Sequence, residues 1–99
     1  MAKSLTDKKV NKAVKKLNKS IKEDVFGDRF FVRQVRKTRG NDNVMYYLYE
    51  YIDRECPERD YLSKGWKSEF SILMFNDLWI EMNEFIINSD FWTKYRANQ

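Results

Sequence analysis

Residues 68–88 read SEFSILMFNDLWIEMNEFIIN, and this stretch decides the fold that the sequence predicts. Its first half alternates with a period of two, as a β-strand does, at Phe70, Ile72 and Met74. Its second half repeats apolar residues at steps of one, three and four, as a broad helical stripe does. The residues of that stripe are Leu78, Trp79, Met82, Phe85 and Ile86. Asn76 or Asp77 is suited to cap the helix, so we predict a strand over residues 68–75 that turns tightly into an amphipathic helix.

The apolar face of this helix needs a sheet to cover it, and the preceding residues supply the strands. Residues 29–39 and 44–53 mix β-branched, aromatic and other residues without a helical period. The turn residues Gly40-Asn41-Asp42-Asn43 between them predict a β-hairpin. Pro57 marks a corner or an edge, because proline cannot donate a hydrogen bond to a sheet. Residues 61–67 then form a short third strand.

Most of the positive charge lies in the N-terminal segment. Residues 1–22 hold eight lysines against Asp7 alone, a net charge of +7, so the remaining residues carry −3 of the overall +4. Residues 4–23 have the spacing of one helical face, formed by Leu5, Val10, Val14, Leu17 and Ile21. We predict a helix here, and two roles stay open. It is either a solvated arm that aids solubility or a helix whose lysines track phosphates and add salt-dependent affinity.

The predicted fold class is therefore α+β, with an N-terminal helix, a four-stranded antiparallel sheet and a C-terminal amphipathic helix. Residues 1–27 form a lysine-rich helical arm and linker, and residues 28–99 form the domain. A chain of 99 residues has a small core. We expect the strongly apolar C-terminal helix to be buried by a second copy, as a homodimer. The dimer interface is predicted at Trp79, Met82, Phe85 and Ile86.

The composition argues against several classes of function. The chain has no histidine, which removes the usual general base and the commonest metal ligand. Its single cysteine, Cys56, has no imidazole to activate it and cannot form an internal disulfide, which fits a reducing compartment. No apolar run approaches a membrane span, and the start lacks a signal-peptide core. We expect a non-enzymatic protein without metal or cofactor, in the cytoplasm of a bacterial or phage-infected cell, or in the nucleus if the source is eukaryotic.

One face of the predicted hairpin carries the functional signal. Arg29, Arg33, Lys37 and Arg39 alternate with Phe31 on the first strand, and Tyr47, Tyr49 and Tyr51 stand beside them on the second. Cationic groups neutralise phosphates, and flat rings stack on bases that have left a duplex. Such a face predicts binding of a single-stranded nucleic acid. The alternative is structural, in that the tyrosines pack against a second sheet or a helix.

The order of these parts resembles the single-stranded-DNA-binding domain of the transcriptional coactivator positive cofactor four, the Sub family, from about Arg29 to Ile87. The V-x-V-R strand of that family corresponds to Phe30-Phe31-Val32-Arg33. Its R-E-Y strand end is met by Tyr49-Glu50-Tyr51. Its I-S-L-x-x-x-x-W entry to the helix is met by Ile72-Leu73-Met74 and Trp79.

The resemblance implies a curved sheet, a homodimer formed through the helices, and strand-lined channels for single-stranded DNA. Arg33 takes the place of a DNA-contacting arginine, and Arg36 and Lys37 fall near basic residues at the strand end. Val35 stands where the family often has a stacking phenylalanine, and Tyr49 replaces an arginine. Lys64 and Lys67, with Trp66 between them, fall near the Gly-Arg-Lys-Gly segment of the family. The lysine-rich arm departs from the serine-rich arm of the eukaryotic coactivator and favours a bacterial or bacteriophage member.

The leading hypothesis is a homodimeric single-stranded-DNA-binding protein that acts in transcription, replication or recombination. The alternatives are a protein-interaction module for a polymerase or repair factor, and an RNA-binding domain with an aromatic platform. The residues predicted to bind nucleic acid are Arg29, Phe31, Arg33, Arg36, Lys37, Arg39, Tyr47, Tyr49, Tyr51, Lys64, Trp66 and Lys67.

Overall fold

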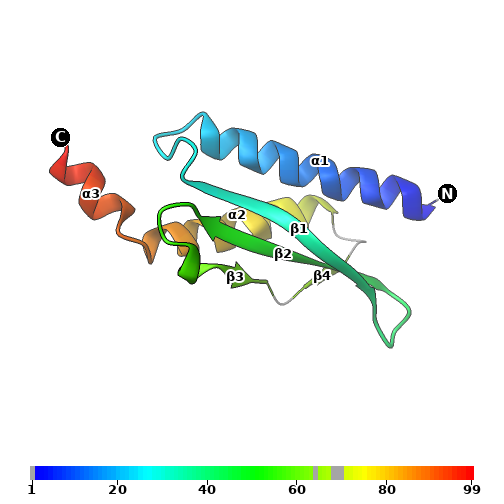
Figure 1. The fold of residues 1–99 in the computed structure, drawn as a ribbon. Coiled ribbons are helices and arrows are strands. Elements are labelled where there is room, and N and C mark those ends of the chain that lie inside the picture. The colour runs from blue at the N-terminus through cyan, green and yellow to red at the C-terminus, as the bar shows by residue number, and fades with distance from the viewer. Residues whose placement is uncertain (1, 64, 68–70) are drawn as a thin grey trace.

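A computed structural model describes residues 2–63, 65–67 and 71–99 of the chain. Its elements follow the order α1 (Ala2–Lys22), β1 (Phe30–Arg39), β2 (Met45–Asp53), the short 3-10 helix η1 (Pro57–Arg59), β3 (Tyr61–Leu62), β4 (Trp66–Lys67), α2 (Ser71–Ile87) and α3 (Phe91–Ala97). The class is α+β, as predicted, and the predicted N-terminal helix is present as α1 (Figure 1).

The sheet is three strands wide, so the predicted four-stranded sheet is wrong. β1 and β2 form the predicted antiparallel hairpin. Both β3 and β4 pair with the opposite edge of β2, at Glu50–Tyr51 and at Tyr46–Tyr47, and together they occupy one strand position. The predicted last strand over 68–75 is helical from Ser71 onward, while residues 68–70 lie outside the described part. The run ILMF at residues 72–75 is apolar throughout, and such a run does not distinguish a strand from a buried helix.

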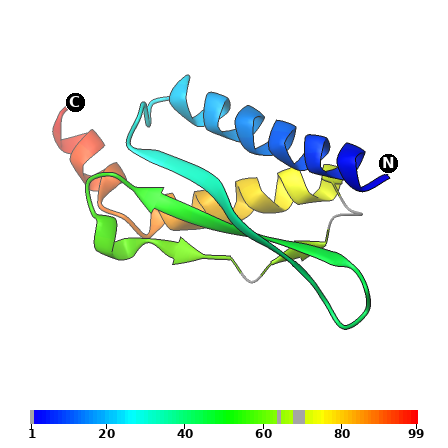
Figure 2. The same cartoon turned by 45° about the vertical axis from the view of Figure 1, so that its right-hand side comes forward.

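The two long helices lie side by side on one face of the sheet (Figures 1 and 2). The core between these layers holds residues of every long element. It comprises Val10, Leu17, Ile21, Phe30, Val32, Tyr47, Tyr49, Tyr51, Leu78, Met82, Phe85, Ile86 and Phe91. Helix α1 is therefore part of the single core and not a separate arm. Asn18 fastens it to the edge strand, since its side-chain amide donates to the carbonyl oxygen of Val32 (2.8 Å) and its oxygen accepts from the Val32 N–H (2.9 Å).

The predicted dimer interface on α2 is occupied within the single chain. Met82, Phe85 and Ile86 are buried against the sheet and α1, and Trp79 is half-buried against the same core. The sequence argument for a dimer was that one copy could not cover this helix. That argument is wrong because α1 supplies a second helical layer, which leaves these four residues with intramolecular partners.

A β-bulge divides the basic residues of β1 between the two faces of the sheet. Gln34 lies opposite Tyr49 but Arg36 lies opposite Leu48, so Val35 is an extra residue on β1. Residues that face each other across the ladder share a side of the sheet. Arg33 and Arg36 therefore lie on the outer face. Lys37 and Arg39, which we had placed with Arg33, lie on the face of the tyrosines instead.

The docking of α1 gives a first testable prediction. Leu17→Ala should lower the free energy of unfolding by about 2–5 kcal/mol, because it removes a fully buried side chain from the contact with the sheet. Urea denaturation followed by circular dichroism measures the change. The matched control is Lys12→Ala on the solvent side of the same helix, where the expected change is within about 0.5 kcal/mol. Equal stability of the two variants would show that α1 is not part of the core.

Candidate nucleic-acid interface

The three tyrosines predicted to stack on bases lie in the core. Tyr47, Tyr49 and Tyr51 have at most 1% of their surface exposed. Tyr51 donates its hydroxyl to the carboxylate of Glu81 on α2 (3.1 Å), and burial raises the pKa of Tyr49 well above its usual value. The predicted stacking role is therefore wrong for all three. The structural alternative, packing against a helix, is what the fold shows, because α1 and α2 cover this face.

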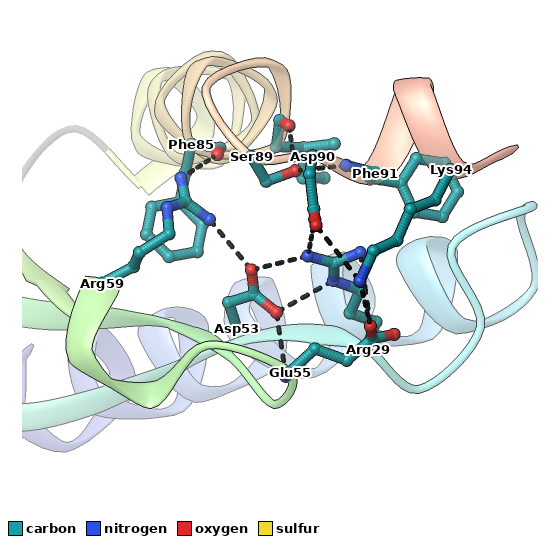
Figure 3. A network of polar contacts seen from close by, with 10 residues as sticks. Arg29, Asp53, Glu55, Arg59, Phe85, Ser89, Asp90, Phe91 and Lys94 are labelled. Atoms are coloured by element: carbon teal, nitrogen blue, oxygen red, sulfur yellow. Dashed lines mark hydrogen bonds and ion pairs between the residues drawn. The ribbon is translucent and has the colours of Figure 1, made fainter. Parts of the chain in front are cut away.

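Arg29 was expected to contact phosphate, but its guanidinium is buried in a polar network (Figure 3). It donates to both carboxylate oxygens of Asp53, from Nε at 2.9 Å and from Nη2 at 3.1 Å. Nη2 also donates to Asp90 at the start of α3. Arg29 thus joins the start of β1 to the end of β2 and to α3, and it is not available to an external anion.

Asp53 is the centre of this network and is fully buried. It accepts from Arg29 and from Nη1 of Arg59 (2.9 Å), while Arg59 also donates to the carbonyl oxygen of Phe85 in α2 (2.7 Å). Burial acts to raise the pKa of Asp53. Hydrogen bonds from Arg29, the Glu55 N–H and Arg59 outweigh burial, so the pKa is lowered. Hydrogen bonds from Arg29 and Lys94 lower the pKa of Asp90 to about 2.

This network makes stability depend on acid pH. Both carboxyl pKa values lie below the ordinary value of 3.8, so the stabilisation is present above about pH 4 and is lost as pH falls toward 2. Arg29→Met should cost about 3–5 kcal/mol at pH 7, because it leaves a buried carboxylate without its main partner. Urea denaturation at pH 7 and pH 3 should show that the difference in unfolding free energy between wild type and Arg29→Met is smaller at pH 3. An equal loss of unfolding free energy at both pH values would show that the ionised carboxylates are not what Arg29 stabilises.

The outer face of the sheet keeps part of the predicted basic surface. Phe31 is half-buried, with the guanidinium of Arg54 4.3 Å above its ring centre. Arg33 is exposed but pairs with Glu50 at 2.8 Å, so a phosphate would have to compete with that carboxylate. Arg36 is exposed, and no described residue bonds to it. Of the outer-face candidates, Arg36 is the one best placed to meet an anion.

The remaining candidates follow the hairpin toward its turn. Lys37 and Arg39 are exposed near the tip, and Arg39 donates to the backbone and side-chain oxygens of Asn43. Trp66 and Lys67 form β4 through backbone pairing with Tyr47 and Tyr46, and their side chains lie outside the described part. Lys64 also lies outside it.

The lysine face of α1 was not among the predicted site residues, although phosphate binding was one of the two roles left open for this helix. We define it as the exposed residues Lys8, Lys9, Lys12, Lys15, Lys16, Lys19 and Lys22. Within the described part of the chain, only Lys19 and Lys22 pair with a carboxylate, at 4.0 and 3.6 Å and both exposed. Lys16 lies 4.8 Å from the ring centre of Phe75. The sequence spacing already indicated this face, because the lysines from Lys8 to Lys22 lie on the side of the helical wheel opposite Val10, Val14, Leu17 and Ile21.

A hollow on the surface beside α1 concentrates these charges. Its volume is about 510 Å³, which is comparable to that of a ligand pocket, and its lining among described residues is Lys8, Lys9, Asn11, Lys12 and Lys15. Four ammonium groups without a described carboxylate partner repel one another, so an anion in this hollow would be stabilised by all four.

Other chemistry finds less support in the described residues. Among them there is no group of three or more side chains placed to hold a metal ion, and no helix is long and apolar enough to cross a membrane. A hydrogen bond with Glu58 raises the pKa of the Cys56 thiol, which disfavours the reactive thiolate. The lysine face and the basic hairpin are therefore the strongest candidate site.

No protein-family model matches the chain, and neither the curated proteins nor the solved structures include a match. The resemblance to the coactivator domain thus stays a prediction, and the four-stranded sheet that it implied differs from the observed sheet. The Ile72-Leu73-Met74 motif that carried part of the resemblance lies in the first turns of α2 and not in a strand.

Proposed function

We propose that the protein binds nucleic acid through the phosphate backbone, using the lysine face of α1. The observation that supports the proposal is that the positive charge is concentrated on one helix, while the rest of the chain is net negative. The first 22 residues hold a net +7, and the seven lysines from Lys8 to Lys22 are exposed on a helix that is docked on the core. From Lys8 to Lys22 the face is about 21 Å long at 1.5 Å per residue, which is long enough to follow several phosphates.

Binding by the lysine face has little preference for sequence and does not require a single strand. The expectation of single-stranded DNA depended on rings that stack on bases, and the tyrosines of β2 are buried. Ammonium groups on a rigid helix contact phosphates, which single strands and duplexes both present. A role in transcription, replication or recombination remains compatible with this mode of binding.

The proposal predicts a strong salt dependence carried by α1. Lys12→Gln/Lys15→Gln should weaken binding to a duplex of about 30 base pairs roughly 10- to 100-fold at 0.1 M salt, and should reduce the slope of log K against log salt by about 2. Fluorescence anisotropy of a labelled duplex across a salt series measures both quantities. A labelled single strand of equal length should lose affinity in the same variant, because the lysine face contacts phosphates, which both forms present.

The matched control removes the same charge elsewhere. Arg54→Gln/Arg96→Gln lowers the net charge by the same two units, and both side chains are exposed outside the proposed interface. This variant should keep most of the affinity and nearly all of the salt slope. If both double variants lose affinity equally, binding reflects net charge alone and the proposed interface on α1 is wrong.

A second candidate function, a protein-interaction module, is favoured by the exposed surface of α2. Helix α2 contains Asp77, Glu81 and Glu84 and no lysine or arginine. Ile80 and Ile87 on it are more than half exposed. An open cleft of about 360 Å³ lies between α2 and β3, lined by Arg59, Tyr61, Glu81, Glu84, Phe85 and Asn88. An acidic, partly apolar surface suits a partner segment that carries lysine or arginine beside apolar residues.

This second candidate predicts binding of a basic amphipathic peptide. Calorimetric titration with a synthetic Lys/Leu helix should show saturable binding that Ile80→Ser/Glu84→Gln weakens. The control Lys12→Gln/Lys15→Gln should leave the peptide affinity unchanged, because it lies on the other helix. Absence of saturable binding to the wild-type protein would remove this candidate.

A further inference from the structure

Hydrogen bonds within the loop order the tip of the β1–β2 hairpin. Gly40 and Val44 close a three-residue loop through the bond from Gly40 N to Val44 O (2.8 Å), and Asn43 has a positive φ of 62°. Asp42 accepts from the Val44 N–H (3.2 Å) and from the Tyr46 hydroxyl (2.8 Å). A Cβ on Gly40 would lie 2.6 Å from the Tyr46 ring, so this position needs glycine. These bonds fix the shape of the loop before any partner arrives.

The hairpin tip, which we define as residues 38–45, extends beyond the third strand position. The last described pairing on that edge of β2 is at Tyr46. The loop projects away from the helices at the end of the molecule where α1 begins (Figures 1 and 2). At about 3.3 Å per residue, the tip reaches about 10 Å past this pairing. The major groove of B-DNA is about 12 Å wide and 8.5 Å deep and admits a two-stranded ribbon.

The side chains on the tip include groups that can hydrogen-bond to the edges of bases. Arg39 uses Nη1 to hold Asn43 (3.2 Å to Oδ1), and no described residue bonds to its other guanidinium nitrogens. Asn41 is exposed at the loop, and its amide has no partner among the described residues. Arginine donates to guanine O6 and N7, and asparagine pairs with adenine N6 and N7. Asp42 is engaged by the two bonds within the turn.

We propose that the hairpin tip enters the major groove of double-stranded DNA, where Arg39 and Asn41 contact base edges while Arg36 contacts the flanking phosphates. This inference depends on the proposed nucleic-acid binding and adds its partner, duplex DNA. A-form RNA is not the partner, because its deep, narrow major groove does not admit side chains. The exposed cations of the hairpin, Arg36, Lys37 and Arg39, give this segment a positive field toward the groove.

Dimethyl sulfate footprinting on a duplex of mixed sequence tests the proposal, because the reagent methylates guanine N7 in the major groove. The wild-type protein should protect guanines within its binding site. Arg39→Gln/Asn41→Ala should lose this protection and weaken duplex binding several-fold. Gly40→Ala keeps every charge but disturbs the loop, so it should also lose the protection. Thermal unfolding of each variant checks that the fold is intact.

The matched control, Arg54→Gln/Asn83→Ala, changes the same two residue types at exposed positions away from the tip. It should retain the guanine N7 protection. If the wild-type protein binds duplex DNA without protecting N7, or protects adenine N3 in the minor groove instead, the groove assignment is overturned and phosphate binding by α1 stands. If the wild-type protein binds no nucleic acid even at low salt, the proposed function fails and this inference fails with it.

Discussion

The row of tyrosines on β2 is the constraint on which the rest of the structure depends. Tyr47, Tyr49 and Tyr51 project from one face of the central strand, and removing three large rings from water is a major favourable term for so short a chain. Residues of α1 and α2 join them in one core, and Tyr51 contacts Glu81 and Phe85 of α2. Docking α1 in this way turns its apolar stripe inward and its lysines outward. The burial of the tyrosines thus creates the lysine face.

At the far end of the sheet a polar network takes the place of further apolar core. Asp53 ends the central strand in a fully buried position, where an unpaired carboxylate would be costly. Arg29 and Arg59 satisfy it from two directions, and the same two arginines reach Asp90 and the end of α2. The network therefore sets where α3 leaves α2. It also explains why a strongly basic residue beside the first strand is structural and not a ligand for phosphate.

The opposite end of the hairpin is under different constraints. The bulge at Val35 changes which side chains face the helices, and beyond Tyr46 β2 pairs with β1 alone among the described strands. Bonds within the loop hold this segment, so its shape does not need support from the core. One hairpin therefore contributes tyrosines to the core at its base and exposed polar groups at its tip. The lysine face of α1 begins at the same end of the molecule, which allows one duplex to meet both surfaces.

The sequence by itself determined the α+β class, the hairpin with its turn, and the amphipathic helix over residues 4–23, because period, turn residues and charge are local properties. It also placed the tyrosines on a single face. Tertiary structure decided which face was buried, since α1 covers a surface that the local pattern leaves equally suited to stacking on bases. It decided that 71–75 is helical, because an unbroken apolar run fits either a strand or a buried helix. It also decided the roles of Arg29 and Val35, because ion-pair partners and bulges depend on which residues pairing brings together.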